Sequence, residues 1–244
     1  MIRAVLTGLL LAATGSAASA EDGWSFAVSP YVWLPGISTT TQIANRTLDA
    51  DLSASDAISN LDFAFMGAAE ARNGKWGLIL DTIYSDISID KDTPFGRLWS
   101  KAELDTKLSA TTLYAAYRLV DTAKGSVDLL GGARFYDLDM TVSLVPGRRG
   151  PESRSLGDSW TDPVFGLRGR YLFNEKWFAA GIADAGGFSS DASSYQLFGS
   201  LGYQFDARWS AQAGWRYLDV ERDIDGDDLA LNLSGPLIGL TFRF

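Results

Sequence analysis

The last ten residues, Gly235 to Phe244 (GPLIGLTFRF), decide the fold. Their apolar side chains fall on one side of a two-residue period, and glycine, threonine and arginine fall on the other, as in a β-strand with one apolar face. That apolar face consists of Ile238, Leu240, Phe242 and Phe244. On an edge strand of a soluble domain, an exposed apolar face promotes aggregation. On a strand whose outer face meets lipid, an apolar face is required.

Residues 1–20 predict export. Arg3 supplies a short positive start, residues 4–13 form an apolar run, and Ala18-Ser19-Ala20 is a small-residue cleavage site. The run is shorter than the roughly 20 residues that a transmembrane helix needs. We therefore predict a cleaved signal peptide, residues 1–20, followed by a single outer-membrane β-barrel domain, residues 21–244.

The composition agrees with a membrane protein built from strands. The chain has no cysteine, which excludes a disulfide framework, thiol chemistry and a lipid-modified cysteine. Its 25 glycines, 8 tryptophans, 9 tyrosines and 13 phenylalanines suit a sheet with lipid-facing aromatic belts. The net charge of −9 argues against a nucleic-acid partner.

A tight turn followed by a basic residue and a tryptophan recurs along the chain. It occurs as Asn73-Gly74-Lys75-Trp76, Asn174-Glu175-Lys176-Trp177 and Asp206-Ala207-Arg208-Trp209. A tryptophan at a constant distance from a short turn predicts an aromatic girdle at one membrane interface, made of Trp76, Trp177 and Trp209. The alternative is the aromatic core of a soluble sandwich, which does not explain the basic residue before each tryptophan.

The alternating runs between turns predict ten strands. From the first turn onward they cover about residues 76–89, 101–119, 127–143, 160–173, 177–187, 194–205, 209–222 and 229–244, and upstream they cover 24–36 and 61–72. Short turns alternate with longer polar connections, as periplasmic turns alternate with extracellular loops. The predicted fold is an all-β, transmembrane, antiparallel up-and-down β-barrel of about ten strands, with eight or twelve as alternatives.

Residues 37–60 are ambiguous. Residues 47–52 read as a further strand, and residues 53–61 read as a short helix with Ser53 as its N-cap. A membrane crossing by residues 41–52 would bring the count to eleven, whereas bacterial single-chain barrels have even strand counts. We therefore expect residues 37–60 to lie outside the wall or to fold into the mouth as a partial cap, with a short helix in this first long loop.

Alternation also sorts charged residues onto the face opposite the apolar ones. An arginine that faces lipid at mid-depth costs roughly 2–4 kcal/mol, so the charged face must be the lumen. The predicted lumen charge network comprises Glu70, Asp81, Arg118, Arg134, Asp162, Arg168, Arg170, Asp184 and Arg216. Either these side chains pair and fill a narrow barrel, or they line a selective path for a small polar solute.

The sequence argues against an enzyme. It contains no histidine, and no other side chain titrates near neutral pH without a perturbed pKa. A Ser-His-Asp triad is therefore excluded, as are a cysteine nucleophile and zinc-ligand spacing. Asp162 and Asp184 lie among predicted lumen arginines, which favour their ionised forms over an acid–base pair. We predict no catalytic residue, no metal site and no cofactor.

Several ordered motifs resemble a widespread family of poorly characterised proteobacterial outer-membrane β-barrel proteins. They are Ser29-Pro30-Tyr31, Trp33, Pro35-Gly36, Trp160-Thr161-Asp162-Pro163, Gly166, Arg168, Asp184, Gly186-Gly187-Phe188, Gly202-Tyr203, the run from Gly214 to Asp219, Gly235-Pro236 and Arg243-Phe244. The terminal phenylalanine also resembles the C-terminal assembly signal of bacterial outer-membrane barrels, here Ile238, Leu240, Phe242 and Phe244. One departure is Ser189-Ser190-Asp191, where the family pattern implies more glycine. The resemblance implies a barrel and transfers no activity.

Two functions remain open at this stage. The first is a porin-like barrel in the cell outer membrane, with a structural role or a narrow passage for a small polar solute. The second is a surface-interaction barrel whose loops engage a host, a phage or lipopolysaccharide. In both cases the expected partners are outer-membrane lipid, lipopolysaccharide and the barrel-assembly machinery.

Overall fold

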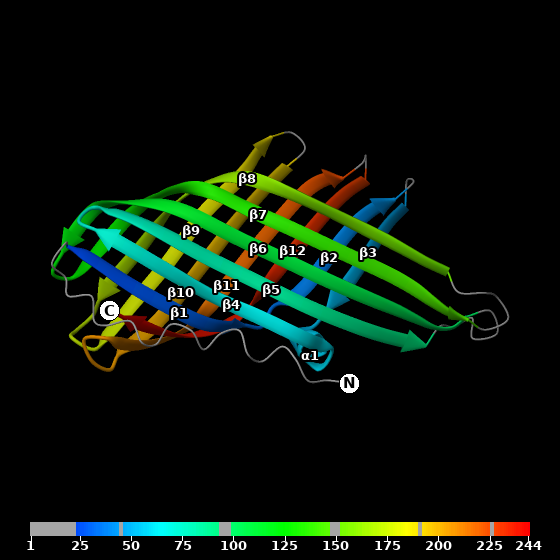
Figure 1. The fold of residues 1–244 in the computed structure, drawn as a ribbon, viewed down its shortest axis with the longest axis horizontal. Helices are drawn as coiled ribbons and strands as arrows, with labels where there is room; N and C mark the ends of the chain where they lie inside the picture. Colours follow the sequence, from blue (N-terminus) through cyan, green and yellow to red (C-terminus); the bar gives the residue numbers. More distant parts are fainter. Residues whose placement is uncertain (1–22, 44–45, 93–98, 147–151, 190–191, 225–226) are drawn as a thin grey trace.

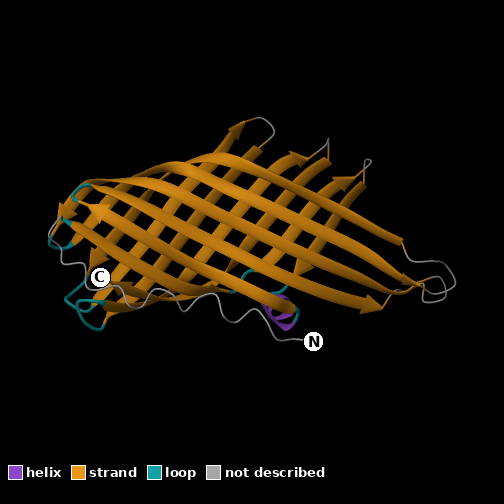
Figure 2. Cartoon of the chain, viewed as in Figure 1, coloured by secondary structure: helices purple, strands orange, loops and turns teal. Residues whose placement is uncertain are grey.

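The computed structural model describes residues 23–43, 46–92, 99–146, 152–189, 192–224 and 227–244. The predicted signal peptide lies outside these residues. Within them the chain forms one antiparallel sheet and one short helix (Figure 2). No helix among the described residues is long and apolar enough to cross a membrane.

The described residues form twelve strands, and ten of these close into a ring. The strands are β1 (Trp24–Trp33), β2 (Gly36–Ile43), β3 (Arg46–Leu52), β4 (Leu61–Asn73), β5 (Trp76–Asp92), β6 (Trp99–Thr122), β7 (Gly125–Pro146), β8 (Glu152–Leu172), β9 (Trp177–Ser189), β10 (Ala192–Gln204), β11 (Trp209–Ile224) and β12 (Asp227–Arg243). The ring runs from β1 through β4 to β12, and β1 pairs with β12 to close it (Figure 1). The predicted transmembrane up-and-down barrel of ten strands is confirmed.

The two ends of the barrel differ. The turns after β4, β6, β8 and β10 lie at one end, together with Gly23 and Phe244, and we call this the turn end. The opposite end is the loop end. There β5 to β8 reach farther along the barrel axis than the other strands (Figure 1). β6 has 24 residues, more than twice the 9–11 that a tilted membrane strand needs.

Strand β8 begins earlier than the sequence predicted. Residues 152–159 pair with β7, although their sequence reads as a polar loop. Ser155 and Thr141 are hydrogen-bonded through their hydroxyls, as are Ser153 and Ser143. A strand with polar side chains on both faces gives no alternating hydrophobic signal, so this extension could not be found from the sequence.

Residues 37–52 extend the sheet, so the expectation that they cap the mouth is wrong. β2 continues β1 along β12 in an unbroken register, since Val28 pairs with Phe242 and Leu229 with Thr41. Leu34 and Pro35 interrupt the strand, and they cross Gly235 so closely that a Cβ there would lie 2.1 Å from the Leu34 oxygen. β3 then returns along β2.

The barrel wall splits where β1 leaves β4. The two strands pair from Trp24–Asn73 to Pro30–Gly67, and the next pair across this hairpin is Ile37–Leu52, formed by β2 and β3. Between these two pairs lie six residues, 31–36, on the side that runs from β1 to β2. On the descending side, which runs from β3 to β4, fourteen residues, 53–66, lie between them. The descending side therefore carries eight more residues than continuous pairing would allow.

Helix α1 (Ala54–Ser59) uses these additional residues. The Ser53 hydroxyl accepts a hydrogen bond from the Asp56 amide at 3.2 Å, which confirms the predicted N-cap. At its other end the Asn60 carbonyl accepts from the Ser88 amide of β5. α1 also contacts β2, so it bridges the two sides of the split (Figure 1).

Candidate functional site

The outer surface is apolar, and the C-terminal strand shows the predicted alternation. Ile238 is 65% exposed, Leu240 and Phe244 are also exposed, and Leu237 on the opposite face is buried. Phe242 is half-buried because its ring packs against Trp209 and Phe244. This surface would force apolar side chains into water unless lipid covers it.

The three tryptophans of the predicted girdle lie at the turn end and are exposed. Trp177 packs against Tyr203, with ring centroids 5.1 Å apart, and Trp209 packs against Phe242 at 4.7 Å. Trp76 packs against Tyr117 at 4.9 Å. Each tryptophan therefore forms an aromatic pair at one level of the barrel, as expected at a membrane interface.

The contacts in two of these turns explain why an asparagine or an aspartate opens them. The Asn174 side-chain oxygen accepts hydrogen bonds from the amides of Lys176 and Trp177 at 2.9 and 2.8 Å. The Asp206 carboxylate accepts from the amides of Arg208 and Trp209 in the same way, at 2.7 and 2.8 Å. These hydrogen bonds, that from Trp209 above all, lower the pKa of the Asp206 carboxyl.

The third turn differs, because Gly74 has a φ of 55°. That left-handed conformation suits glycine in a two-residue hairpin turn.

The lumen near the turn end holds a cluster that we call the turn-end tier. Arg168 of β8 donates to Glu70 of β4 at 2.8 Å and to Asp128 of β7 at 2.7 Å. Arg72 bridges the same two acids at 2.9 Å each, and Arg118 pairs with Asp128. β4 and β8 are not neighbours in the sheet, so the Arg168–Glu70 pair spans the lumen.

A second cluster, the central tier, crosses the lumen farther up. Arg216 of β11 pairs with Asp81 of β5 at 2.7 Å, and Arg134 of β7 pairs with Asp184 of β9 at 2.8 Å. Gln196 joins the two pairs, because it donates to Asp184 at 2.8 Å and accepts from Arg216 at 2.9 Å.

Two tyrosines complete the central tier. The Tyr31 hydroxyl donates to Asp81 at 2.7 Å and accepts from Arg216 at 2.8 Å. The Tyr114 hydroxyl donates to Asp184 at 2.8 Å and accepts from Arg134 at 2.9 Å. Arg134 is only 1% exposed, so its charge is compensated almost entirely inside the protein.

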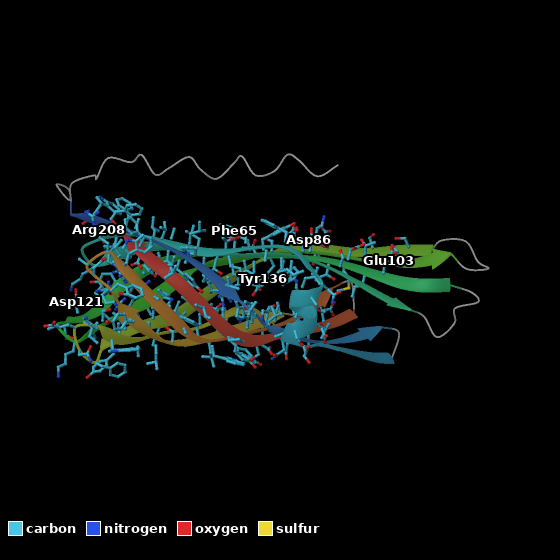
Figure 3. All side chains as sticks on the ribbon, turned by 90° about the horizontal axis from the view of Figure 1, so that it is seen from below. Phe65, Asp86, Glu103, Asp121, Tyr136 and Arg208 are labelled. Atoms are coloured by element: carbon cyan, nitrogen blue, oxygen red, sulfur yellow. The ribbon has the colours of Figure 1, made fainter. Side chains whose placement is uncertain are left out.

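Beyond the central tier the lumen becomes largely apolar. Tyr136, which Figure 3 labels inside the barrel, stacks on Trp160 with ring centroids 4.9 Å apart. The buried members of this inner apolar layer are Trp33, Ile83, Ala110, Tyr136, Trp160, Leu218, Val220, Leu233 and Leu237. Asp162 and Arg222, 3.5 Å apart, lie beside it.

The structure thus brings eight of the nine predicted lumen residues into ion pairs. Arg170 differs, because among the described residues it has no carboxylate partner and instead stacks over Phe178 and donates to Gln204. Sequence reasoning missed Arg72 and Asp128. Arg72 lies on the same face of β4 as Glu70, and Asp128 lies on the same face of β7 as Arg134. It also missed Tyr31, Tyr114 and Gln196, which are uncharged and carry no signal of their own.

Three solved structures indicate what this fold is similar to. The outer membrane protease OmpT of Escherichia coli has a TM-score of 0.60 at 11% identity, covering 91% of this chain and 97% of that chain. The translocator domain of the autotransporter NalP of Neisseria meningitidis has a TM-score of 0.43 at 12% identity, covering 91% and 88%. Ail, the attachment invasion locus protein of Yersinia pestis, has a TM-score of 0.38 at 13% identity, covering 91% and 99%.

Of these three, OmpT is the one whose TM-score exceeds 0.5, and it is an outer-membrane protein. At 11% identity the likeness to OmpT concerns the fold alone. No protein-family model and no curated protein matches the sequence. The predicted family resemblance therefore remains a prediction, while the outer-membrane barrel fold is shown.

Proposed function

We propose that this chain is an integral protein of the bacterial outer membrane whose lumen is held closed by the turn-end and central tiers. Its role would be structural, with at most a narrow passage for small polar solutes when these tiers rearrange. The observation that carries the proposal is that Arg168–Glu70, Arg216–Asp81 and Arg134–Asp184 join strands that are not neighbours. A ten-stranded barrel is close to the size that side chains can fill.

The location and the export route belong to the same proposal. Residues 1–20 would act as a cleaved signal peptide, and the apolar face ending in Phe244 would serve the barrel-assembly machinery as a recognition signal. A non-enzymatic role is supported by the absence of histidine and cysteine from the sequence. It is also supported by the arginines that occupy the buried carboxylates Asp128 and Asp184.

Planar-bilayer conductance of the refolded mature chain tests the closed lumen. We expect a folded barrel, identified by its heat-modifiable gel mobility, that produces no discrete steps. Replacing Arg72, Arg168, Arg134 and Arg216 together by alanine should produce steps, because it removes every arginine that joins non-neighbouring strands in these two tiers. If that variant does not fold, the milder change of the same four residues to methionine keeps the stems of the side chains and still removes the charges.

Arg208→Ala, in an exposed turn, is the matched control and should stay silent. Two results would contradict the proposal. One is steady conductance by the unmodified chain, with an ion selectivity that shifts on Arg216→Glu. The other is a folded variant without these four arginines that remains silent, which would show that these tiers do not close the lumen.

A second function is supported by the length of β6, β7 and β8. These strands of 24, 22 and 21 residues extend beyond the apolar belt and form a projecting sheet at the loop end (Figure 1). Such a surface suits contact with lipopolysaccharide or another cell surface. Replacing residues 142–153 by a short turn should abolish binding of the refolded chain to immobilised lipopolysaccharide while preserving its heat-modifiable mobility. Undiminished binding by the shortened chain would exclude this surface.

A further inference from the structure

An apolar pocket lies where the wall splits. Its volume is about 110 Å³, and its surface is mostly apolar. The lining comes from β1, β2, α1, β4, β5, β6 and β12, and comprises Tyr31–Pro35, Ile37, Ala54, Leu61, Ala64, Met66, Ile83, Ser85, Ile87, Leu108 and Leu233. Several of these residues also belong to the inner apolar layer or pack against it, so the pocket is continuous with the apolar part of the lumen.

The pocket touches residues that belong to both faces of the wall. Five consecutive residues of the chain, Tyr31–Pro35, line it. Successive residues of a strand point to opposite faces of a sheet. Val32 accordingly is 58% exposed on the outside, and Trp33 is 2% exposed on the inside. A cavity that touches both kinds of residue lies at the edge of β1, where β4 no longer covers it.

The strand edges at this position lack their usual partners. The Trp33 amide, which points toward β4, donates to the Met66 sulfur at 3.3 Å. A thioether is a weak acceptor, and a backbone group without a good partner is costly inside a bilayer. An edge of this kind is tolerated where water and lipid headgroups are close. The depth of the split therefore decides what can occupy the pocket.

The outward side chains beside the split give that depth. Phe63, Phe65 and Tyr84 form an aromatic patch on the outer surface, with Phe63 and Tyr84 in ring contact at 5.9 Å. The next outward positions toward the loop end carry charge, since Asp86 of β5 is paired with Lys107 of β6 at 3.9 Å. Figure 3 shows Phe65 midway along the barrel and Asp86 nearer the loop end. The split therefore lies at the boundary between hydrocarbon and headgroups.

We propose that this pocket binds the upper methylene groups of an acyl chain from an outer-membrane lipid, which enter sideways between β1 and β4. The lipid headgroup would stay outside, level with Asp86 and Lys107. An engineered apolar cavity of about 150 Å³ holds a benzene molecule and excludes water, so a cavity of 110 Å³ suits a few methylene groups. Acyl chains are the apolar molecules present at this depth in every membrane. The binding is independent of whether the lumen conducts.

Photolabelling tests this proposal. The mature chain is refolded into detergent-free vesicles containing a phosphatidylcholine with a diazirine on an upper methylene group of one acyl chain, and the labelled residues are mapped by mass spectrometry after irradiation. A diazirine that stays in the bilayer can label only outward residues such as Phe65 and Leu80. A diazirine in the pocket also labels Met66 and Ile83, which point inward. We expect labelling of both sets.

Two alanines of β4 provide a matched pair of variants. Ala64 lines the pocket, and Ala69, on the same strand, has the opposite parity and lies outside it. Ala64→Leu should reduce labelling of Met66 and Ile83 at least about fivefold, because the added side chain occupies the cavity, whereas Ala69→Leu should leave it unchanged. Heat-modifiable mobility verifies that both variants fold.

Labelling confined to outward residues would overturn the proposal. So would inward labelling that Ala64→Leu does not reduce, because the acyl chain would then reach Met66 and Ile83 by another route. Neither result bears on the conductance measurement, so the closed lumen and the acyl-chain pocket can fail separately.

Discussion

The turn-end half and the loop-end half of this barrel are built from the same strands and close in different ways. At the turn end β1 pairs with both β4 and β12, and the lumen is tied across by arginines and carboxylates. Toward the loop end β1 and β4 separate, α1 fills part of the split, and the lumen becomes apolar. The interior is thus charged where β1 pairs with both of its neighbours, and it is apolar where β1 and β4 separate.

The difference shows that alternation alone does not close a barrel. β4 keeps alternating on the loop-end side of the split, where β1 no longer pairs with it, with exposed Phe63 and Phe65 and half-buried Ala64 and Met66. What changes at Gly67 is the length of chain available, because eight additional residues prevent the β1–β4 register from continuing. The length of chain between the β1–β4 pairing and the β2–β3 pairing therefore decides where the wall is continuous.

The largest expected effect lies in the turn-end tier. Asp128 is almost fully buried and pairs with Arg72, Arg118 and Arg168. Asp128→Ala leaves Arg72 and Arg168 to share Glu70 and leaves Arg118 with the exposed Asp121. Breaking a buried ion pair from one side costs about 3–5 kcal/mol. We expect a loss of that size in the free energy of unfolding, measured by urea titration of the refolded barrel in vesicles.

Asp121→Ala is the control for this change. Asp121 also pairs with Arg118, at 3.3 Å, but its side chain is 71% exposed. Exposed ion pairs contribute little, so the loss should stay below about 1 kcal/mol. Equal losses for the two variants would show that burial does not distinguish the turn-end tier from the surface.

A smaller effect should separate the two sides of the split. Backbone amides of residues 31–35 and 61–66 lie next to an unpaired edge, whereas those of residues 24–30 and 67–73 belong to complete ladders. We expect hydrogen exchange at least about tenfold faster in the first set, because fewer hydrogen bonds must open. Deuterium uptake measured by mass spectrometry checks this.

Residues 194–198 of β10 provide the reference for that measurement. They pair with both β9 and β11 and should exchange slowly. Equally slow exchange in residues 31–35 and 61–66 would mean that the edges at the split are as well protected as a closed ladder.

The smallest effect lies in the turns. The lowered pKa of Asp206 means that its carboxylate stabilises the turn at neutral pH and loses that contribution as the pH falls from the ordinary aspartate pKa through the lowered value. Asn174 makes the same contacts without titrating. The protection of the Trp209 amide relative to the Trp177 amide should therefore decrease on acidification, as measured by hydrogen exchange.

Asp206→Asn should remove that pH dependence while keeping the hydrogen bonds. A ratio of Trp209 to Trp177 protection that stays constant with pH in the unmodified chain would show that the carboxylate charge adds nothing to the turn.

Much of this architecture follows from the sequence. The penalty for an arginine in lipid fixed the strand register, and the structure shows Arg134, Arg168 and Arg216 inside. The start of β8 was missed because residues 152–159 carry no apolar face. Which lumen charges pair could not be derived, because Arg168 and Glu70 meet across the barrel, 98 residues apart in the chain.

The sequence by itself determined that this chain forms a membrane barrel, since a two-residue hydrophobic period is a local property of each strand. It also determined which side chains face lipid. Side chains alternate between the two faces of a strand, so one charged residue assigned to the lumen assigns the other residues of that strand. Only the tertiary structure decided how the lumen is filled and where the wall splits. Those features depend on contacts between strands that are distant in the sequence and on the length of chain between two ladders, neither of which has a local signature.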